Sequence, residues 1–203
     1  MRIEELDFRL RIRQAKQEGH HPKSKSMNIR IERLNPSLIE TYFKFKKTCG
    51  YDWCYCTAWM SASWEEFGKR SANENFLIRD TLFSVGHFDG FLIFNDEKVI
   101  GWVQVTQIKN LRRLLDEYKM QDFKEDWAIT CWAIDEKLHM KGVATETLPM
   151  ILKFLKEQKA KRVFAFPFRR EHDFWSGPEN LYKRAKFEVH KDDPENPIFT
   201  KTI

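Results

Sequence analysis

One segment in the second half of the chain has the residue types of an anion-binding helix start: His139-Met140-Lys141-Gly142-Val143-Ala144-Thr145. An apolar run at 127–134 precedes it, and a helical pattern opens at Gly142. The first N–H groups of a helix have no intrahelical partner, and the helix dipole adds positive potential there. A strand that leads into such a start predicts a phosphate-binding site, to which Lys141 adds charge. An ordinary helix-start glycine is the alternative.

The four cysteines are Cys49, Cys54, Cys56 and Cys131. A disulfide framework is not expected in a chain of this size and composition. Cys49 and the C-x-C pair Cys54 and Cys56 offer three thiolates for zinc, but structural zinc sites usually have four ligands in paired C-x-x-C spacings. We therefore expect free thiols and no metal. Cys131 lies in mid-strand without a paired histidine, which favours a buried structural cysteine over a nucleophile.

The composition excludes several classes of protein. The chain has 203 residues, of which 42% are hydrophobic and 32% charged, as expected for one globular domain. Lys and Arg exceed Asp and Glu by only 35 to 30 and form no clustered stripe, so nucleic acid is not an expected partner. No apolar run is long enough to span a membrane, and no signal peptide is evident, so we expect a cytoplasmic protein.

Hydrophobic periodicity and turn residues predict the elements that position these residues. Residues 1–26 have the pattern of an N-terminal appendage, and the main domain is expected at 27–203. Strands are predicted at 28–34, 90–94, 99–107, 127–134, 162–166, 187–190 and 198–202, and helices at 36–47, 63–85, 110–118, 142–158 and 178–185. The order indicates one mixed α/β domain. Helix 142–158 is long enough to be a crossover, so strands 127–134 and 162–166 should be parallel. Strict alternation places Cys131 with Ile129 and Ala133 on one face, opposite Trp132.

The predicted order of strands and helices, together with three sequence stretches, resembles the GNAT superfamily of acetyl-CoA-dependent N-acetyltransferases. In 139–144, Gly142 and Ala144 match the Q/R-x-x-G-x-G/A loop of that family, while His139 replaces its leading Gln or Arg. Segment 161–167 is similar to the strand after the crossover helix. Segment 181–187 resembles the family's (F/L)-Y-x-K-x-G-F pattern, with Lys186 in place of Gly. The loop Trp53-Cys54-Tyr55-Cys56-Thr57-Ala58-Trp59 resembles a subgroup with a W-C-x-C stretch.

The resemblance, which covers about 27–203, implies an acyl-CoA N-acyltransferase fold: a mostly antiparallel sheet with one splayed parallel strand pair, flanked by helices. It implies acetyl-CoA as cosubstrate, bound between the splayed strands where backbone groups of strand 127–134 lack partners. The implied cofactor-binding residues are Trp132, Ala133, Ile134, His139, Met140, Lys141, Gly142, Val143, Ala144 and Thr145. Tyr182 is the implied general acid that protonates the departing thiolate. A core tyrosine on an amphipathic helix is its alternative.

The acceptor is expected to be a small-molecule amine. Trp53, Tyr55 and Trp59 are candidate substrate-binding aromatics, because aromatic faces attract cationic amines; packing beneath a long loop is an equal alternative. Asp135 and Glu136 follow the central strand and are candidates for the general base, although charged loop residues explain them more simply. Exposed terminal strands make a homodimer plausible. A non-catalytic acyl-CoA-binding or protein-interaction module of the same fold is the alternative function.

Overall fold

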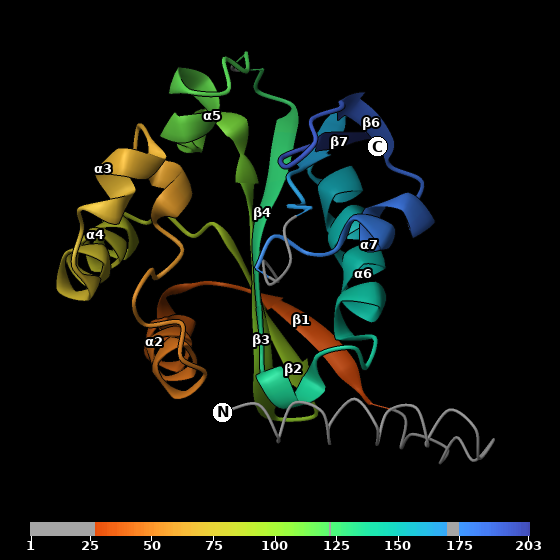
Figure 1. Ribbon diagram of the computed structural model, residues 1–203. Coiled ribbons are helices and arrows are strands. Elements are labelled where there is room, and N and C mark those ends of the chain that lie inside the picture. The colour runs from red at the N-terminus through yellow and green to blue at the C-terminus, as the bar shows by residue number, and fades with distance from the viewer. Residues whose placement is uncertain (1–26, 122, 170–174) are drawn as a thin grey trace, which may run out of the picture.

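The computed structural model describes residues 27–121, 123–169 and 175–203, so the predicted appendage at 1–26 lies outside the described residues. The strands are β1 (Ile29–Arg33), β2 (Gly90–Asn95), β3 (Lys98–Gln107), β4 (Asp126–Ile134), β5 (Arg162–Ala165), β6 (Glu188–Lys191) and β7 (Ile198–Thr202). The helices are α2 (Ile39–Thr48), α3 (Trp64–Gly68), α4 (Ala72–Ser84), α5 (Arg112–Asp116), α6 (Val143–Glu157) and α7 (Glu179–Arg184). In this part of the chain the strands form one sheet, in the order β1-β2-β3-β4-β5-β7-β6 (Figure 1).

The sheet is antiparallel except between β4 and β5, which the crossover helix α6 joins in parallel. This pairing runs only from Asp126 opposite Arg162 to Ile129 opposite Ala165. Beyond Ile129 the two strands separate, and β5 ends just before Pro167. The mixed sheet with one splayed parallel pair confirms the predicted fold class.

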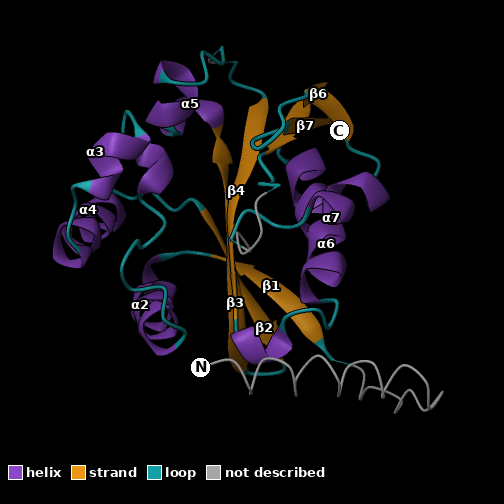
Figure 2. Ribbon diagram, in the orientation of Figure 1, coloured by secondary structure: helices purple, strands orange, loops and turns teal. Residues whose placement is uncertain are grey.

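Helices cover both faces of the sheet (Figure 2): α2, α3 and α4 lie on one side and α6 and α7 on the other. The predicted helix 63–85 is two helices, because Ser71 starts a new one. The Ser71 side chain accepts from the Glu74 amide, and Glu74 accepts from the Ser71 amide, as a capping box does. Asn35 caps the 3-10 turn Pro36–Leu38 that leads into α2. No helix of the described ranges is long and apolar enough to cross a membrane.

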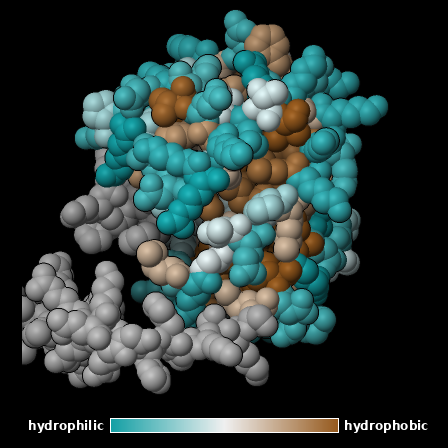
Figure 3. Space-filling model, turned by 90° about the vertical axis from the view of Figure 1, so that its right-hand side faces the viewer, coloured by the Kyte–Doolittle hydropathy of each residue, from teal (hydrophilic) through white to brown (hydrophobic). Residues whose placement is uncertain are grey.

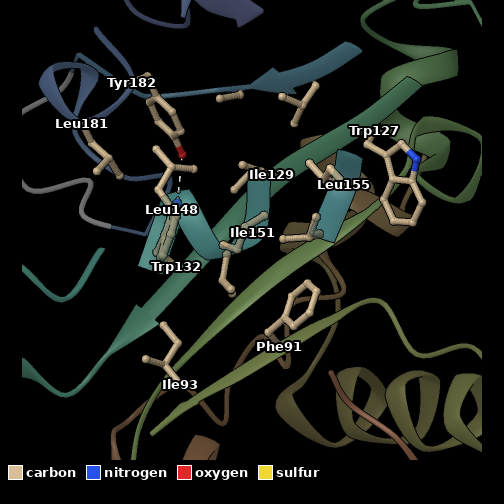
Figure 4. Packing of buried hydrophobic residues seen from close by; sticks show 14 of the residues in the cluster. Phe91, Ile93, Trp127, Ile129, Trp132, Leu148, Ile151, Leu155, Leu181 and Tyr182 are labelled. Atoms are coloured by element: carbon tan, nitrogen blue, oxygen red, sulfur yellow. Dashed lines mark hydrogen bonds between the residues drawn. The ribbon is translucent and has the colours of Figure 1, made fainter. Parts of the chain in front are cut away.

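Hydrophobic clusters lie on both sides of β4 in the described residues, and two of them contain its central part. On the α6 side, Ile129 and Trp132 pack with Leu148, Ile151 and Leu155, among others (Figure 4). Seen from outside, the face with α6 and α7 shows apolar residues between polar ones (Figure 3). The α2 side holds a second cluster that includes the following residues: Tyr42, Phe45, Leu92, Trp102, Cys131 and Ala133.

The strict alternation predicted for β4 is wrong at its centre. Gln104 pairs with Cys131 and Val105 pairs with Ile129, so Thr130 is an extra residue in β4. This β-bulge resets the alternation, which places Ile129 with the α6-side cluster and Cys131 with the α2-side cluster. Cys131 therefore faces the Trp53–Trp59 loop side of the sheet, where α2 packs.

Candidate active site

The free edge of β4, beyond the point where β5 departs, is satisfied by other parts of the chain. The Trp132 amide donates to the Trp175 carbonyl. The Trp59 indole N–H donates to the Thr130 carbonyl at 3.1 Å. The Ile134 carbonyl accepts from the Tyr51 hydroxyl at 3.3 Å and lies 3.0 Å from His139 Nε2. These three backbone groups of the edge are thus engaged, and a ligand that binds any of them has to replace an existing contact.

The turn that precedes α6 has the backbone conformation of an anion cradle. Met140 and Gly142 are both left-handed, with φ of 62° and 87°. The nearest atom to a Cβ on Gly142 would be Glu146 Oε1 at 4.0 Å, so its φ, and not lack of space, requires glycine. The first helical bond runs from the Glu146 amide to the Gly142 carbonyl, so the amides of residues 143–145 precede it. These amides and the exposed Lys141 fit a pyrophosphate.

Tyr182 lies at the free edge of β4, although fifty positions separate it from Trp132 in the sequence. Its ring is fully buried, and its hydroxyl accepts from the Trp132 indole N–H at 2.9 Å (Figure 4). The hydroxyl donates to the Ser176 carbonyl at 2.8 Å. Burial raises the pKa of Tyr182 well above its ordinary value, although the Trp132 hydrogen bond acts against this. The hydroxyl is therefore protonated at neutral pH, as a general acid must be.

Gly177 allows the segment after residue 174 to approach this site closely. It is left-handed, with φ of 78°. A Cβ at this position would lie 3.0 Å from Tyr182 Oη and 3.1 Å from the Trp132 indole ring. The glycine therefore brings the Trp175 carbonyl to β4 and the Ser176 carbonyl to Tyr182, and it is a site residue that the sequence motifs did not single out.

The three candidate acceptor aromatics lie in three different surroundings. Trp59 is 1% exposed and packs in a group of rings that comprises Trp64, Tyr118, Phe166 and Trp175. Tyr55 contacts the rings of Phe43 and Phe76. Trp53 is 54% exposed and contacts Phe67, with ring centroids 5.9 Å apart. Of the three, Trp59 is the one that contacts the free edge of β4.

The loop that carries these aromatics is held by a buried polar network. Arg79 and Asp89 form an ion pair of 2.7 Å in which both side chains are fully buried. Arg79 also donates to the carbonyls of Tyr55 and Cys56, at 2.9 and 2.8 Å. Gln104 donates to Asp89 and to the Cys56 carbonyl. Sequence patterns did not reveal this network, because Arg79 lies in an ordinary helical pattern and Asp89 in a turn before a strand.

Cys54, Cys56 and Cys131 surround a buried ammonium group, that of Lys46 on α2. Lys46 Nζ lies 3.3 Å from Cys56 Sγ and 3.9 Å from Cys54 Sγ, and Cys56 Sγ lies 3.0 Å from Cys131 Sγ. Among the described residues, none of the four cysteines takes part in a disulfide. The ammonium group stands among the sulfur atoms where a metal ion would bind. Across the described ranges, no group of three or more His, Cys, Asp or Glu side chains fits a metal ion.

A groove of about 770 Å³ lies between α2, the start of β3 and the connection from β4 to α6. Its charged lining contains both signs in equal number: Glu40, Lys44, Lys98, Asp135, Glu136 and Lys137. Within it, Asp135 caps the 3-10 turn Glu136–Leu138 by accepting from the Lys137 amide at 3.1 Å. This capping role accounts for Asp135, so the general base of the reaction stays unassigned.

Known proteins share a family sequence pattern with this chain and have a similar fold. Residues 53–187 match the model of the acetyltransferase (GNAT) family. The fold is similar to the PaiA N-acetyltransferase from Thermoplasma acidophilum in complex with coenzyme A, at 15% identity, a TM-score of 0.54 and coverage of 87% of this chain and 100% of that one. It is also similar to Campylobacter jejuni N-acetyltransferase PseH in complex with acetyl coenzyme A, at 18% identity, a TM-score of 0.50 and coverage of 86% and 98%.

The ribosomal-protein-S18-alanine N-acetyltransferase from Escherichia coli has the same fold, at 10% identity, a TM-score of 0.50 and coverage of 86% of this chain and 94% of that one. No protein with a curated description matches the sequence. The family match spans more than half of the chain and includes β4, the Gly142 turn, α6 and Tyr182. The chain therefore belongs to the GNAT family of acetyltransferases, for which acetyl-CoA is the cosubstrate.

Proposed function

We propose that this protein transfers the acetyl group of acetyl-CoA to the amine of a small molecule, by direct attack of the amine on the thioester. The observation that carries the proposal is the meeting of three features at the splayed edge of β4. The Trp132 amide points out from that edge, the Tyr182 hydroxyl lies beside the Trp132 indole, and the α6 start follows the strand. Together they offer groups for the pantetheine, the sulfur and the pyrophosphate of one extended molecule.

The cofactor residues take distinct roles in this proposal. Backbone groups of Trp132, Ala133 and Ile134 bind the pantetheine arm once the Trp175 carbonyl leaves the Trp132 amide. The following residues surround the pyrophosphate: His139, Met140, Lys141, Gly142, Val143, Ala144 and Thr145. His139 stands where the family pattern has Gln or Arg. Its contact with the Ile134 carbonyl ties the turn back to β4, so it supports the turn that presents the amides.

Tyr182 donates a proton to the departing thiolate in this proposal. Burial raises the pKa of Tyr182, which by itself weakens it as an acid. The same burial raises the pKa of a thiol released at this position, because desolvation disfavours both anions. Burial therefore raises the pKa of the Tyr182 hydroxyl and the pKa of the released thiol together, so proton transfer from the hydroxyl to the thiolate stays feasible. The hydroxyl proton, now directed at the Ser176 carbonyl, has to turn toward the sulfur.

In this proposal the acceptor amine binds on the α2 side of β4. The candidate walls are the aromatics of the loop, Trp53, Tyr55 and Trp59, which can attract a cationic amine before it is deprotonated. Trp59 is the strongest of the three, because its indole N–H binds the Thr130 carbonyl at the bulge where the strands part.

Two measurements test this function. Calorimetry with acetyl-CoA measures binding, and release of free thiol across a panel of small amines measures turnover. Tyr182→Phe should lower kcat by about 10²–10⁴-fold and leave acetyl-CoA affinity nearly unchanged, as expected for a group that acts in proton transfer. Tyr118→Phe is the matched control, because it removes a tyrosine hydroxyl whose ring packs against Trp59 and Phe166, whereas the Tyr182 ring packs against Phe187.

The outcomes separate the alternatives. Equal turnover of Tyr182→Phe and the unchanged protein would remove Tyr182 as the acid. Acetyl-CoA binding without thiol release for any amine would favour a non-catalytic acyl-CoA-binding module. Absence of binding at high micromolar acetyl-CoA would rule out both functions.

A further inference from the structure

The proposed acetyl transfer uses none of the groups around Lys46, although they form the most unusual polar cluster of the fold. The Lys46 side chain is fully buried, and Cys54, Cys56 and Cys131 are between 2 and 8% exposed. They come from three separate elements, namely α2, the loop before the 3-10 turn Ala58–Met60, and β4. Tyr51 covers the ammonium group, with its ring centre 5.1 Å from Nζ. A lysine buried in this way needs an anion beside it, because an unpaired buried charge is strongly unfavourable.

Cys56 supplies that anion. Burial by itself raises the pKa of the Cys56 thiol, but hydrogen bonds with Cys131 and Cys54 and the positive charge of Lys46 outweigh it, so that the pKa lies well below its ordinary value. The pKa of Lys46 is raised despite its burial, because Cys56 lies beside it. The pKa values of Cys54 and Cys131 are raised, through their hydrogen bonds with Cys56 and through burial. Of the three thiols, that of Cys56 is therefore the one whose thiolate form the cluster favours, beside the Lys46 ammonium group.

The thiolate is held against a thiol from a distant part of the sequence. Cys56 Sγ lies 3.0 Å from Cys131 Sγ, and a disulfide requires about 2.05 Å, so a shift of about 1 Å separates contact from a bond. The Cys56 backbone is left-handed, with φ of 54°, which costs a non-glycine residue free energy. Arg79 and Gln104 maintain this conformation by binding the Cys56 carbonyl. The loop is therefore built to keep this sulfur at Cys131.

We propose that Cys56 and Cys131 are a redox-modification site, in which a small hydroperoxide oxidises Cys56 and Cys131 then closes a reversible disulfide. Low-pKa thiolates next to a second thiol are the groups that respond to peroxide in this way. The site goes beyond acetyl transfer, and its chemistry does not depend on that activity.

The atoms and electrons balance as follows with hydrogen peroxide as the oxidant. The Cys56 thiolate attacks one peroxide oxygen, an S–O bond forms, the O–O bond breaks and hydroxide leaves. That hydroxide takes a proton from Lys46, whose counter-charge has gone, and becomes water. Cys131 sulfur then attacks Cys56 sulfur: the S–S bond forms, the S–O bond breaks, and the thiol proton leaves with the oxygen as a second water. The sulfurs lose two electrons, which the peroxide oxygens gain.

Burial makes the site selective for small oxidants. Cys56 is 2% exposed and Cys131 6%, so an aromatic disulfide or a maleimide cannot reach the sulfur, whereas a molecule close to water in size can. Cys49 is the internal comparison: it is half-buried, and burial raises the pKa of its thiol. Bulky reagents should therefore modify Cys49 first, and hydrogen peroxide should modify Cys56 first.

The experiment uses the whole chain with Cys49→Ser, which removes the thiol outside the cluster. Limiting hydrogen peroxide is added, and the intact mass and peptide map are measured with and without a reductant. We expect a mass lower by two hydrogen atoms, mapped to a Cys56–Cys131 cross-link that the reductant reverses. Cys131→Ala should instead stop at a Cys56 sulfenic acid, which is measured as a gain of one oxygen on the Cys56 peptide and which dimedone traps when the protein is unfolded in its presence. Cys54→Ser should still form the cross-link.

The pH profile tests the charge assignment. The charged and titratable groups that face Cys56 are Tyr42 and Lys46 from α2, Cys54, Arg79 from α4 and Cys131 from β4. Cys56 should react with peroxide at a nearly constant rate from about pH 7 to 9. Cys49 should instead react faster throughout this range as pH rises, because burial holds the pKa of its thiol above the ordinary value. In Lys46→Met the Cys56 rate at pH 7 should fall at least about tenfold, which equals one unit of pKa.

Several results would overturn the proposal. One is a cross-link that joins Cys54 to either partner. A second is a product that has gained one oxygen and lost two hydrogen atoms and maps to Lys46 and Cys56. A third is intact Cys56 and Cys131 at a peroxide dose that oxidises Cys49 in the unchanged protein. If the Lys46→Met variant does not fold, the Cys131→Ala variant tests the proposal instead. Absence of a Cys56 sulfenic acid in Cys131→Ala would then overturn it.

Discussion

Asp89→Asn should be among the most damaging isosteric substitutions in this chain. It keeps the size of the side chain and an oxygen that can accept from Gln104, but it removes the charge that balances Arg79. Both Arg79 and Asp89 side chains are fully buried, and their nitrogen and oxygen atoms lie 2.7 Å apart. Arg79 cannot escape by losing its proton, because a guanidinium stays protonated in folded proteins, so the variant keeps a buried positive charge without its partner.

The magnitude follows from this burial. Removing one partner of a fully buried ion pair costs about 3–5 kcal/mol, because the other charge stays buried without compensation. At about 2–4 °C per kcal/mol for a domain of this size, the melting temperature should fall by about 6–20 °C. The total free energy of unfolding of a domain is about 5–15 kcal/mol, so the loss expected for Asp89→Asn is a large fraction of it. The loop from Trp53 to Thr57 should loosen first, because Arg79 also holds the carbonyls of Tyr55 and Cys56.

Urea denaturation followed by tryptophan fluorescence measures the free energy of unfolding of each variant. The matched control is Asp116→Asn, which breaks the ion pair of Asp116 with Arg112, whose side chains are 47% and 65% exposed. That control should lose less than about 1 kcal/mol, as surface pairs do. Similar losses in Asp89→Asn and Asp116→Asn, both below about 1 kcal/mol, would refute the assignment of Arg79 and Asp89 as a buried pair that holds the loop.

Two further substitutions test the backbone geometry. Gly177→Ala places a Cβ 3.0 Å from Tyr182 Oη and 3.1 Å from the Trp132 ring, at a left-handed φ that favours glycine. Calorimetry should therefore show an altered acetyl-CoA affinity, and steady-state kinetics should show a lower kcat. Values equal to those of the unchanged protein would contradict the proposed role of Gly177. Gly90→Ala brings a Cβ within 2.2 Å of the Val103 carbonyl oxygen, so thermal melting should show a loss of several degrees, and an unchanged melting temperature would contradict the β2–β3 packing.

The sequence predicted most of the sheet because its strands are long apolar runs that turn residues separate. β4, α6 and β5 were recognised by their order alone, since a crossover helix forces the flanking strands to be parallel. The faces of β4 were not predictable beyond Ile129, because a bulge leaves no mark on an alternating pattern. The thiol cluster was also missed: Lys46 lies in a pattern that normally exposes lysine, and its burial depends on a loop and a strand far along the chain.

The departure at Lys186 has a structural explanation that the sequence did not contain. The family pattern has glycine at this position, and Lys186 is left-handed, with φ of 59°. The backbone after α7 therefore keeps the conformation that glycine permits, at a cost of about 1–3 kcal/mol for a lysine. The family motif has glycine at position 186 because glycine adopts a left-handed φ most easily. The structure shows that the chain keeps the same left-handed turn with lysine at this position.

The contact between the Trp132 amide and the Trp175 carbonyl has a consequence for the time course of binding. On our proposal, acetyl-CoA can use this amide only in molecules whose carbonyl has already departed, so the measured dissociation constant equals the intrinsic one divided by the fraction of such molecules. If that fraction were about one in a hundred, affinity would be about a hundredfold weaker than the edge of β4 can provide. The observed association rate should then stop rising at high acetyl-CoA concentration and approach the rate at which Trp175 leaves the strand.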